Sequence, residues 1–491
     1  MFRQWLTLVI IVLVYIPVAI DATVLHVAAP TLSMTLGASG NLLLWIIDIY
    51  SLVMAGMVLP MGALGDRIGF KRLLILGGTL FGLASLAAAF AHTASWLIAT
   101  RAILAIGAAM IVPATLAGIR ATFSQARHRN MALGVWAAVG SGGAAFGPLV
   151  GGMLLEHFYW GSVFLINVPI VLVVVALTAR YVPRQAGRRD QSLNLGHAIM
   201  LIVAILLLVY SAKTALKGHI ATGVIALALV SGALLLAQFV RIQLAASRPM
   251  IDMRLFTHRI ILSGVVMAMT AMITLVGFEL LMAQELQFVH GLTPYQAGLF
   301  MLASGFSGPI AGMLVSRLGL RKVATGGMAL SALSFYGLAA TDFSTQQIQA
   351  WMLMALLGFS AASALLASTA AIMAAAPAEK AAAAGAIETM AYELGAGLGI
   401  AVFGLLLSRS FSASIALPDG LNAGEMERAS SSMGEAVQLA QSLPSALADP
   451  VLLAAKQAFT WSHSVALSSA GSMLILLAVG MWFSLAKAAR E

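Results

Sequence analysis

Five acidic side chains lie inside long apolar stretches of this 491-residue chain: Asp21, Asp48, Glu279, Glu388 and Glu393. At roughly 2.5 to 3.5 kcal/mol for each mid-helix charge, their burial in a membrane would cost on the order of 10 kcal/mol in total. Such a cost favours a polar cavity around these groups, in which carboxylates could bind protons and cations.

A single base, Arg101, is embedded in an apolar stretch at a depth similar to that of Asp21 and Asp48. We expect Arg101 to pair with one of these two acids and to leave another free to titrate. Glu285 lies at the outer boundary of its stretch, where solvation would suffice, whereas Glu279 is deeper. His26 is interpreted as a packing residue in preference to a proton carrier.

Glu388 and Glu393 are five residues apart on one predicted helix, which corresponds to about 140° beyond a full turn. They cannot share one narrow face. Glu393 is nearer the middle of the membrane, so we expect Glu393 to face the centre of the cavity and Glu388 to contact a neighbouring helix or the cavity edge. For every one of these acids, a partnered or protonated packing role remains the alternative.

Aromatic and methionine side chains could complete such a cavity. Tyr15, Trp45 and Tyr392 could offer ring faces to cations. The chain has 26 methionines, whose flexible thioethers suit surfaces that accept many apolar shapes, although most could be core or lipid-facing residues. An acidic, aromatic and methionine-rich pocket would select lipophilic cations over anions.

The composition determines which elements hold these residues. With 61% hydrophobic and 9% charged residues and a mean hydropathy of +0.97, the chain is an integral membrane protein, because soluble proteins are near 25% charged. Fourteen apolar stretches have the length of about 17 to 25 residues that spans hydrocarbon. They cover residues 5–29, 42–64, 73–91, 96–118, 134–156, 162–182, 195–215, 220–241, 261–285, 296–316, 323–341, 349–374, 384–408 and 465–486.

The distribution of bases predicts the orientation, because Lys and Arg next to a span stay on the cytoplasmic side. With both termini inside, all but six of the 27 bases are cytoplasmic. Arg101 lies within a span, and Lys213, Lys217, Arg409, Arg428 and Lys456 fall in outer loops. The pI of about 10.0 therefore reflects topology and not nucleic-acid binding. The first stretch is too long for a cleaved signal peptide.

Two halves of the chain repeat a pattern. The turn GALGDRIGFKR, from Gly62 to Arg72, returns as GMLVSRLGLRK from Gly312 to Lys322, with Asp66 replaced by Ser316. Glycines recur at similar offsets: Gly107 with Gly358, and the pair Gly143 and Gly147 with Gly395 and Gly399. We therefore predict two homologous six-helix bundles, residues 1–190 and 251–491, separated by two additional helices in 191–250.

The segment at about 409–463 is longer and more polar than the other connections. Between Leu421 and His463, short amphipathic runs are interrupted by prolines, which predicts a pair of short helices on the outer mouth. A disordered loop is the alternative.

The turn after the second stretch could act as a conformational gate. Its glycines allow a tight turn and close helix approach, and its charges could pair across helices that slide. The gate residues would be Gly62, Gly65, Asp66, Arg67, Gly69 and Arg72. Bases alone could merely enforce topology, but Asp66 adds nothing to that signal.

The fifth stretch has Gly143, Gly147 and Gly151 at four-residue spacing, close to one helix face. Small residues at this spacing pack membrane helices in general, so plain packing is the alternative. Pro148, whose counterpart Ile400 in the second half is not proline, would kink the helix.

In order and spacing, several motifs resemble the major facilitator superfamily, and within it the fourteen-span drug:H+ antiporters of the QacA type. The motifs are DATVLHVAAP from Asp21, Trp45 with Tyr50, GALGDRIGFKR, GPLVGG from Gly147 and WGSVFLINVP from Trp160. The likeness extends over nearly the whole chain, although Arg101 is followed by AILA where the family commonly has R-x-x-Q-G. The resemblance implies that the bent fifth helix seals the cavity against proton leak.

We therefore expect an all-α membrane protein of the major facilitator fold, in a bacterial inner membrane. Its expected function is proton-coupled antiport that exports quaternary ammonium and bis-cationic biocides, dyes and methyl viologen by alternating access. A metabolite or amino-acid exporter and a non-transporting sensor or scaffold are the alternatives. We expect a monomer, no enzymatic activity, no nucleic-acid partner, and no metal or cofactor other than the coupling proton, since no H-x-x-x-H set or cysteine occurs.

Overall fold

The computed structural model describes residues 2–183, 195–215, 222–247, 249–251, 253–304, 320–343, 345–375 and 381–488, and these residues form helices and no strand. The first half consists of α1 Phe2–Leu36, α2 Gly40–Ile68, α3 Phe70–Ala89, α4 Ala94–Thr122, α5 Ala126–His157, α6 Ser162–Leu165 and α7 Asn167–Tyr181, followed by α8 Leu195–Ala215 and α9 Thr222–Ala245. The remaining helices are η1 Met253–Thr257, α10 Arg259–Gln284, the π-helical turn η2 Glu285–Val289, α11 Pro294–Met301, η3 Leu302–Ser304, α13 Leu320–Ala339, α14 Gln347–Ala375, α15 Ala381–Ser414, α16 Ala423–Ser431, α17 Met433–Ala440 and α18 Ser445–Ala488.

Helix starts follow from capping residues in the sequence. Ser39 and Thr93 accept hydrogen bonds from the Leu42 and Trp96 amides with their side-chain oxygens, at 3.4 and 3.2 Å. Thr293 and Gln296 form a reciprocal capping box at the start of α11. These caps satisfy amides that have no partner within the helix.

Twelve helices of the described part are long and apolar enough to cross a membrane. They correspond to twelve of the fourteen predicted stretches. The predicted span 323–341 coincides with α13, a 20-residue helix outside that set of twelve. The predicted span 296–316 begins as α11 and then leaves the described residues, as does the second copy of the turn, Gly312 to Gly319. A count of fourteen spans therefore stays a prediction.

The repeat that the sequence indicates is visible in the packing. In the first half α5 packs on α1, and a Cβ atom built at Gly143 would come within 2.7 Å of the Ala19 Cβ. In the second half α15 packs on α10, and a Cβ at Gly395 would come within 2.7 Å of the Met269 carbonyl oxygen. The corresponding glycines thus serve corresponding helix contacts, in agreement with the predicted homology.

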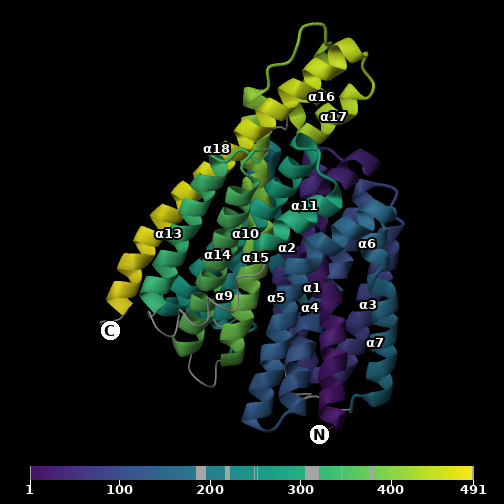
Figure 1. Ribbon diagram of the computed structural model, residues 1–491. Helices are drawn as coiled ribbons and strands as arrows, with labels where there is room; N and C mark the ends of the chain where they lie inside the picture. Colours follow the sequence, from purple (N-terminus) through teal and green to yellow (C-terminus); the bar gives the residue numbers. More distant parts are fainter. Residues whose placement is uncertain are drawn as a thin grey trace.

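Three helix pairs make the most extensive contacts between the two halves in the described part of the chain. α2 packs on α15, α5 on α11, and α1 on α10. Figure 1 shows α1, α3, α4, α5 and α7 of the first half on the right and α10, α13, α14, α15 and α18 of the second half to the left of them, whereas α11 extends toward the first half. Side chains on α1, α2, α5, α10 and α15 therefore lie where a cavity between the halves would be.

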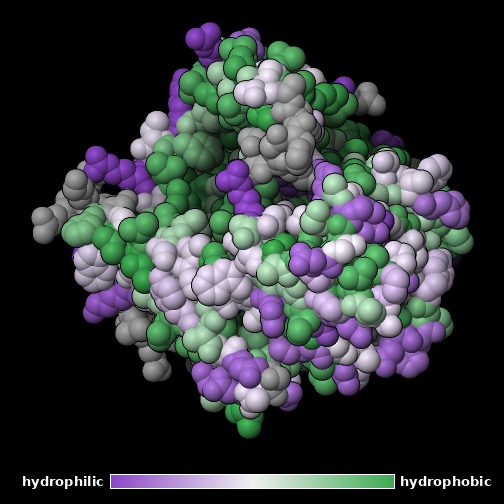
Figure 2. Space-filling model, turned by 90° about the horizontal axis from the view of Figure 1, so that it is seen from above, coloured by the Kyte–Doolittle hydropathy of each residue, from purple (hydrophilic) through white to green (hydrophobic). Residues whose placement is uncertain are grey.

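The segment 409–463 is helical, as the sequence predicts, but its second part differs from the prediction. α16 and α17 are two short helices, whereas the run that begins at Pro450 is the first part of α18. With 44 residues, α18 is about 66 Å long and exceeds the bilayer. It projects beyond the bundle together with α16 and α17 (Figure 1). Figure 2 shows many hydrophilic residues on this end of the molecule.

The two additional helices, α8 and α9, pack on each other, and α8 also contacts α2 and α15. In the last turn of α9, Gln243 is buried and its side-chain oxygen accepts hydrogen bonds from the amides of Met250 and Ile251, at 2.7 and 3.2 Å. This contact fixes the start of the connection to α10.

Candidate functional site

Arg101 of α4 organises the first buried charge group. Its side chain is 2% exposed, and Nη1 donates to the Asp21 Oδ2 of α1 at 2.7 Å. The Nε atom donates to the carbonyl of Ile46 at 3.0 Å, and the guanidinium lies 4.8 Å from the centre of the Tyr50 ring. One side chain thus joins α1, α2 and α4. The expected pairing of Arg101 with one of the two acids is present, and that acid is Asp21.

Asp48 has a different base as its partner, so the expectation that it would be left free is wrong. Lys213 of α8 is 1% exposed, and its Nζ forms an ion pair with Asp48, which is fully buried. The Lys213 Nζ also lies 4.1 Å from the centre of the Trp45 ring. The placement of Lys213 in an outer loop is therefore corrected, because its long side chain points into the helix bundle. The face of the Trp45 ring is therefore already covered by the Lys213 ammonium group.

Glu393 of α15 lies at the boundary between the halves. Its carboxyl group hydrogen bonds with Ser51 of α2, and its charge acts on the hydroxyls of Tyr15 and Tyr50. The side chain is partly exposed although it is inside a span. Within the described residues, no Lys, Arg or His forms an ion pair with it.

An aromatic pair from the first half lies beside this acid. Tyr15 of α1 and Trp136 of α5 stack with ring centroids 4.6 Å apart and an angle of 7° between the planes. The Trp136 Nε1 donates to the Thr115 hydroxyl at 3.0 Å, which fixes the indole. Gly140 allows this packing, since a Cβ there would come within 2.7 Å of the Tyr15 hydroxyl oxygen.

Glu388 is held by hydroxyl groups on the second half. The Tyr392 hydroxyl donates to Glu388 Oε1 at 2.6 Å, and the Thr369 hydroxyl of α14 donates to the same oxygen. Glu388 thus contacts a neighbouring helix while Glu393 faces the other half, which is the division that the helix geometry predicts. The Tyr392 hydroxyl hydrogen is therefore already donated to Glu388.

His26 and Glu279 form a direct contact between the halves. The His26 Nδ1 of α1 lies 3.0 Å from the Glu279 Oε2 of α10, and the two side chains are 1% and 12% exposed. The interpretation of His26 as a simple packing residue missed this partner. The contact joins the two helices that would separate if the halves moved apart at this level.

Glu285 is buried, contrary to the expectation that it could be solvated. It lies at the start of the π-helical turn η2, within 3.3 Å of His290 Nε2 and 3.4 Å of His463 Nδ1. The Thr460 hydroxyl donates to its Oε1 at 3.1 Å. Since His463 and Thr460 belong to α18, this acid links the end of α10 to the helix on which α17 packs.

The turn between α2 and α3 has the compact shape that its glycines predict. Gly69 has a φ of +87°, and a Cβ at Gly65 would come within 2.7 Å of Leu73 Cδ2. Lys71 donates to the carbonyls of Ala179 and Val182 at the end of α7, at 2.9 and 2.7 Å. Asp66, Arg67 and Arg72 are exposed on the same turn.

The glycines and proline of α5 divide between two faces. Gly147 and Gly151 lie against Thr23 and Val24 of α1, and the Thr23 hydroxyl donates to the Ala144 carbonyl at 2.8 Å. The carbonyl of Pro148 faces Gly298 of α11, and a Cβ at Gly152 would come within 2.7 Å of the Tyr295 Cα. The motif is therefore part of a contact between the halves as well as within one half.

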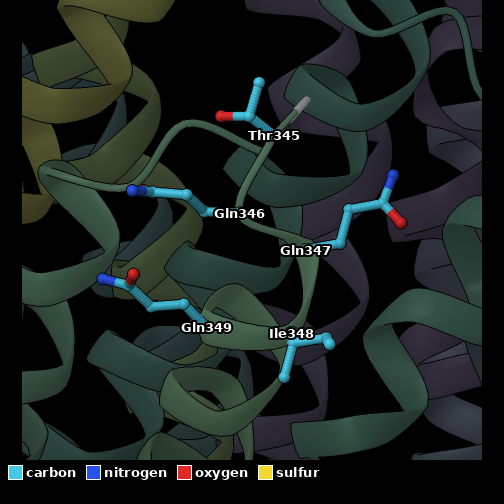
Figure 3. Close-up of a pocket in the computed structure, with 5 residues that line it drawn as sticks. All are labelled: Thr345, Gln346, Gln347, Ile348 and Gln349. Carbon is cyan, nitrogen blue, oxygen red and sulfur yellow. The ribbon is translucent and has the colours of Figure 1, made fainter.

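A hollow at the start of α14 is separate from these residues. It is lined by five consecutive residues, Thr345 to Gln349, whose side chains point in different directions (Figure 3). It includes no acid, base or aromatic ring, so we assign it no role in cation transport.

Sequence reasoning missed Lys213, Trp136, His463 and the role of His26. The available signal for Lys213 was its position within the apolar stretch 195–215. For Trp136 the signal was a tryptophan one turn before Gly140 on the glycine-rich helix. The histidines gave none, because their partners are distant in the sequence.

Comparisons with known proteins agree with this geometry. Residues 11–256 and 260–418 match the family described as Major Facilitator Superfamily. The chain is 87% identical, over all of both chains, to the methyl viologen resistance protein SmvA of Salmonella typhimurium. It is 35% identical to the multidrug efflux pump LfrA of Mycolicibacterium smegmatis, over 98% of this chain and 95% of LfrA.

A solved structure supports the same fold. The chain is similar to a bacterial homologue of the human lysosomal transporter Spinster, in an inward-facing and unoccupied conformation, with a TM-score of 0.66 and 17% identity. The similarity covers 98% of each chain. At this level of identity it bears on the arrangement of helices alone.

Proposed function

This chain belongs to the Major Facilitator Superfamily, and we propose that it is a proton-coupled antiporter that exports lipophilic organic cations. Quaternary ammonium compounds, bis-cationic biocides, cationic dyes and methyl viologen are the substrates that we propose. The names of the relatives, a methyl viologen resistance protein and a multidrug efflux pump, support drug efflux as the general activity. Neither relative is named as an enzyme.

The environment of Glu393 is the observation that carries this proposal. Four buried charges of the first half and of α8 are paired with each other, as Asp21 with Arg101 and Asp48 with Lys213. Glu393, in contrast, has no cationic partner within the described residues, and its charge reaches Tyr15, whose ring stacks on Trp136. A carboxylate next to aromatic faces is suited to an organic cation. We assign Glu393 to cation binding.

Proton coupling would follow from competition for carboxylates. A proton from outside binds a carboxylate in the cavity and is lost when a cation approaches from the cytoplasm. Asp21 is our candidate for this step, because Arg101 binds only its Oδ2, while its Oδ1 is buried without a hydrogen-bond partner. Protonation of Asp21 would weaken its ion pair with Arg101 and so change the packing of α1 against α2 and α4.

Alternating access would use the contacts between the halves. We propose fourteen spans in a 6+2+6 arrangement, with bundles 1–190 and 251–491, both termini in the cytoplasm of a bacterium, and a monomeric protein. The turn from Gly62 to Arg72 would act as the cytoplasmic gate. The contact of Pro148 and Gly152 with α11 would seal the cavity, since opening must separate α5 from α11.

The substitution Glu393→Gln tests the cation site, because it keeps the size and hydrogen bonding of the side chain but removes its charge. We expect weaker transport of both kinds of cation and a larger loss for dications, about tenfold, since the second charge of a dication has no other partner. The measurement is efflux of a monocationic and a dicationic dye from vesicles with an imposed pH gradient.

Glu427→Gln is the matched control, because Glu427 is exposed on α16, away from the cavity. It should transport both dyes as the unmodified protein does. Equal transport of dications by Glu393→Gln and by this control would contradict the assignment of Glu393. Efflux by the unmodified protein that ignores the pH gradient would contradict proton coupling itself.

A further inference from the structure

Lys213 is a fully buried base on α8, one of the two helices that lie between the halves in sequence and whose role the family fold leaves open. Its ammonium group contacts two residues of α2, the Asp48 carboxylate and the ring of Trp45. Burying an ammonium group costs free energy unless the group is paired, so packing alone does not account for a lysine at this position. Thr214 and Ser211 beside it are also buried, and the Ser211 hydroxyl donates to its own helix at Leu207.

The pair with Asp48 completes a group of four charges. Asp21 and Arg101 form the other pair, and Arg101 is the second cation whose field reaches Asp48. Both pairs hold the same turn of α2, since Arg101 donates to the Ile46 carbonyl. With all four groups ionised, their charges sum to zero.

A proton that enters this group makes it positive by one unit. If a carboxylate is protonated, one ammonium or guanidinium loses its counter-ion and the field of the group opposes another cation nearby. Tyr50 connects the group to the proposed cation site, because its ring lies under Arg101 and its hydroxyl is subject to the charges of both Asp21 and Glu393. The group and the cation site therefore share one low-dielectric region.

We propose that Lys213 is a tethered counter-ion that makes α8 part of proton coupling. As a positioning residue, it acts through Asp48. Its charge balances that of Asp48 while a cation is bound, and it is left unbalanced, so that the group becomes positive, when a proton binds Asp48. This inference rests on the proposed antiport, and it assigns a transport role to an added helix.

The other titratable groups on the helices packed against α8 do not replace Lys213. On α2 these are Asp48 and Tyr50, with Asp66 and Arg67 exposed at its far end; on α9, Arg241; and on α15, Glu388, Tyr392, Glu393 and Arg409. Glu388 and Tyr392 are bonded to each other, and Arg241 is exposed. Lys213 is the base that forms an ion pair with Asp48 in the described part of the chain.

The test is a set of charge variants in vesicles with an imposed pH gradient. Lys213→Met alone leaves a buried charge unpaired and risks failure to fold. The double variant Asp48→Asn with Lys213→Met removes both charges, and we expect it to fold. We expect dye efflux driven by the gradient to fall about tenfold, while exchange of dye for dye without a gradient stays within about twofold.

Two single variants keep the inference testable if the double variant is not recovered. Lys213→Arg keeps the positive charge, so we expect gradient-driven efflux within about twofold of the unmodified protein. Lys213→Gln keeps a hydrogen-bonding group without charge, so we expect the loss seen in the double variant and a flatter dependence of efflux on pH.

Gradient-driven efflux and a pH profile like those of the unmodified protein, in the double variant or in Lys213→Gln, would overturn the inference and leave the proposed antiport standing. Loss in Lys213→Arg equal to that in Lys213→Gln would overturn it as well. Efflux by the unmodified protein that does not respond to the gradient would instead remove the proposed function on which the inference rests.

Discussion

At the scale of single residues, the buried carboxylates differ in what their two oxygens contact. Asp21 and Asp48 each have one oxygen bound by a base and one oxygen buried without a hydrogen-bond partner. Glu388 has its oxygen Oε1 held by two hydroxyls, and Glu393 faces the other half. Residue type alone does not decide which acid could bind a proton and which a cation. The partners of each oxygen do.

Asp21→Asn tests the proton step, because an amide still accepts a hydrogen bond from Arg101 but cannot titrate. We expect loss of uphill efflux driven by a pH gradient, about tenfold or more, with some downhill movement of dye retained. Paired measurements of uphill and downhill transport in the same vesicles check this. Asp419→Asn, at an exposed position, is the control. An unchanged pH dependence in Asp21→Asn would mean that Asp21 is structural.

Glu285→Ala tests the buried contact between α10 and α18. The substitution leaves the Thr460 hydroxyl and the buried His463 without their acceptor, which should cost about 1 to 3 kcal/mol of stability. Thermal melting in detergent, with Glu427→Ala as an exposed control, measures this. Equal melting temperatures for the two variants would show that Glu285 contributes nothing to holding α18.

At the scale of elements, close contacts between helices of different halves set what must move. α5 and α11 meet at Pro148, Gly152 and Gly298, where backbone contacts backbone. Packed helices without side chains between them either stay in contact or separate, since a small displacement leaves a gap. A larger side chain at this contact should therefore shift the balance between conformations.

Gly152→Val should push α5 away from α11 at an overpacking cost of about 1 to 3 kcal/mol and favour the separated state. Leu155 is partly buried and packs against the apolar clusters of both halves, and the chain has no cysteine, so a single Leu155→Cys reports access between them. We expect faster labelling by a membrane-impermeant maleimide when Gly152→Val is added. Gly142→Val on the same helix is the control, since a Cβ there meets no atom within 4 Å. Equal labelling rates in the Gly152→Val and Gly142→Val variants would contradict the expectation that a larger side chain at Gly152 separates α5 from α11.

At the scale of the whole molecule, α1 begins and α18 ends at one end, and α16 and α17 lie at the other (Figure 1). The segment that contains α16 and α17 contacts both halves. The Gln438 Nε2 of α17 donates to the Ser33 carbonyl of α1 at 2.7 Å, and α17 also packs on α18. A segment of the second half therefore lies over the end of the first.

The proposed orientation predicts that tags after Arg3 and after Glu491 report the cytoplasm. A tag in the segment that contains α16 and α17 should report the opposite side of the membrane. Gly434 packs against Ser33, so the exposed turn at Asp419 and Gly420 is a better insertion point. Protease protection of the three tags in intact cells and everted vesicles checks this. Termini on different sides would mean an odd number of spans.

The sequence by itself determined the class of protein, the apolar stretches, the internal repeat and which acids lie within those stretches. These follow from composition and from patterns that are local along the chain, and a membrane makes such patterns strong because each span must satisfy its own backbone. The angle between Glu388 and Glu393 also follows from helix geometry alone. The amphipathic run that forms α17 was also predictable from its local pattern, whereas the joining of the run from Pro450 to the last helix was not.

Only the tertiary structure decided which charges are partners. Asp48 and Lys213 are 165 residues apart, and His26 and Glu279 are 253 apart, so no local pattern links them. A lysine near a helix end can direct its long side chain outward to water or inward to an acid, and hydropathy is the same in both cases. For this reason, Lys213 was assigned to a loop and Asp48 was left without its partner.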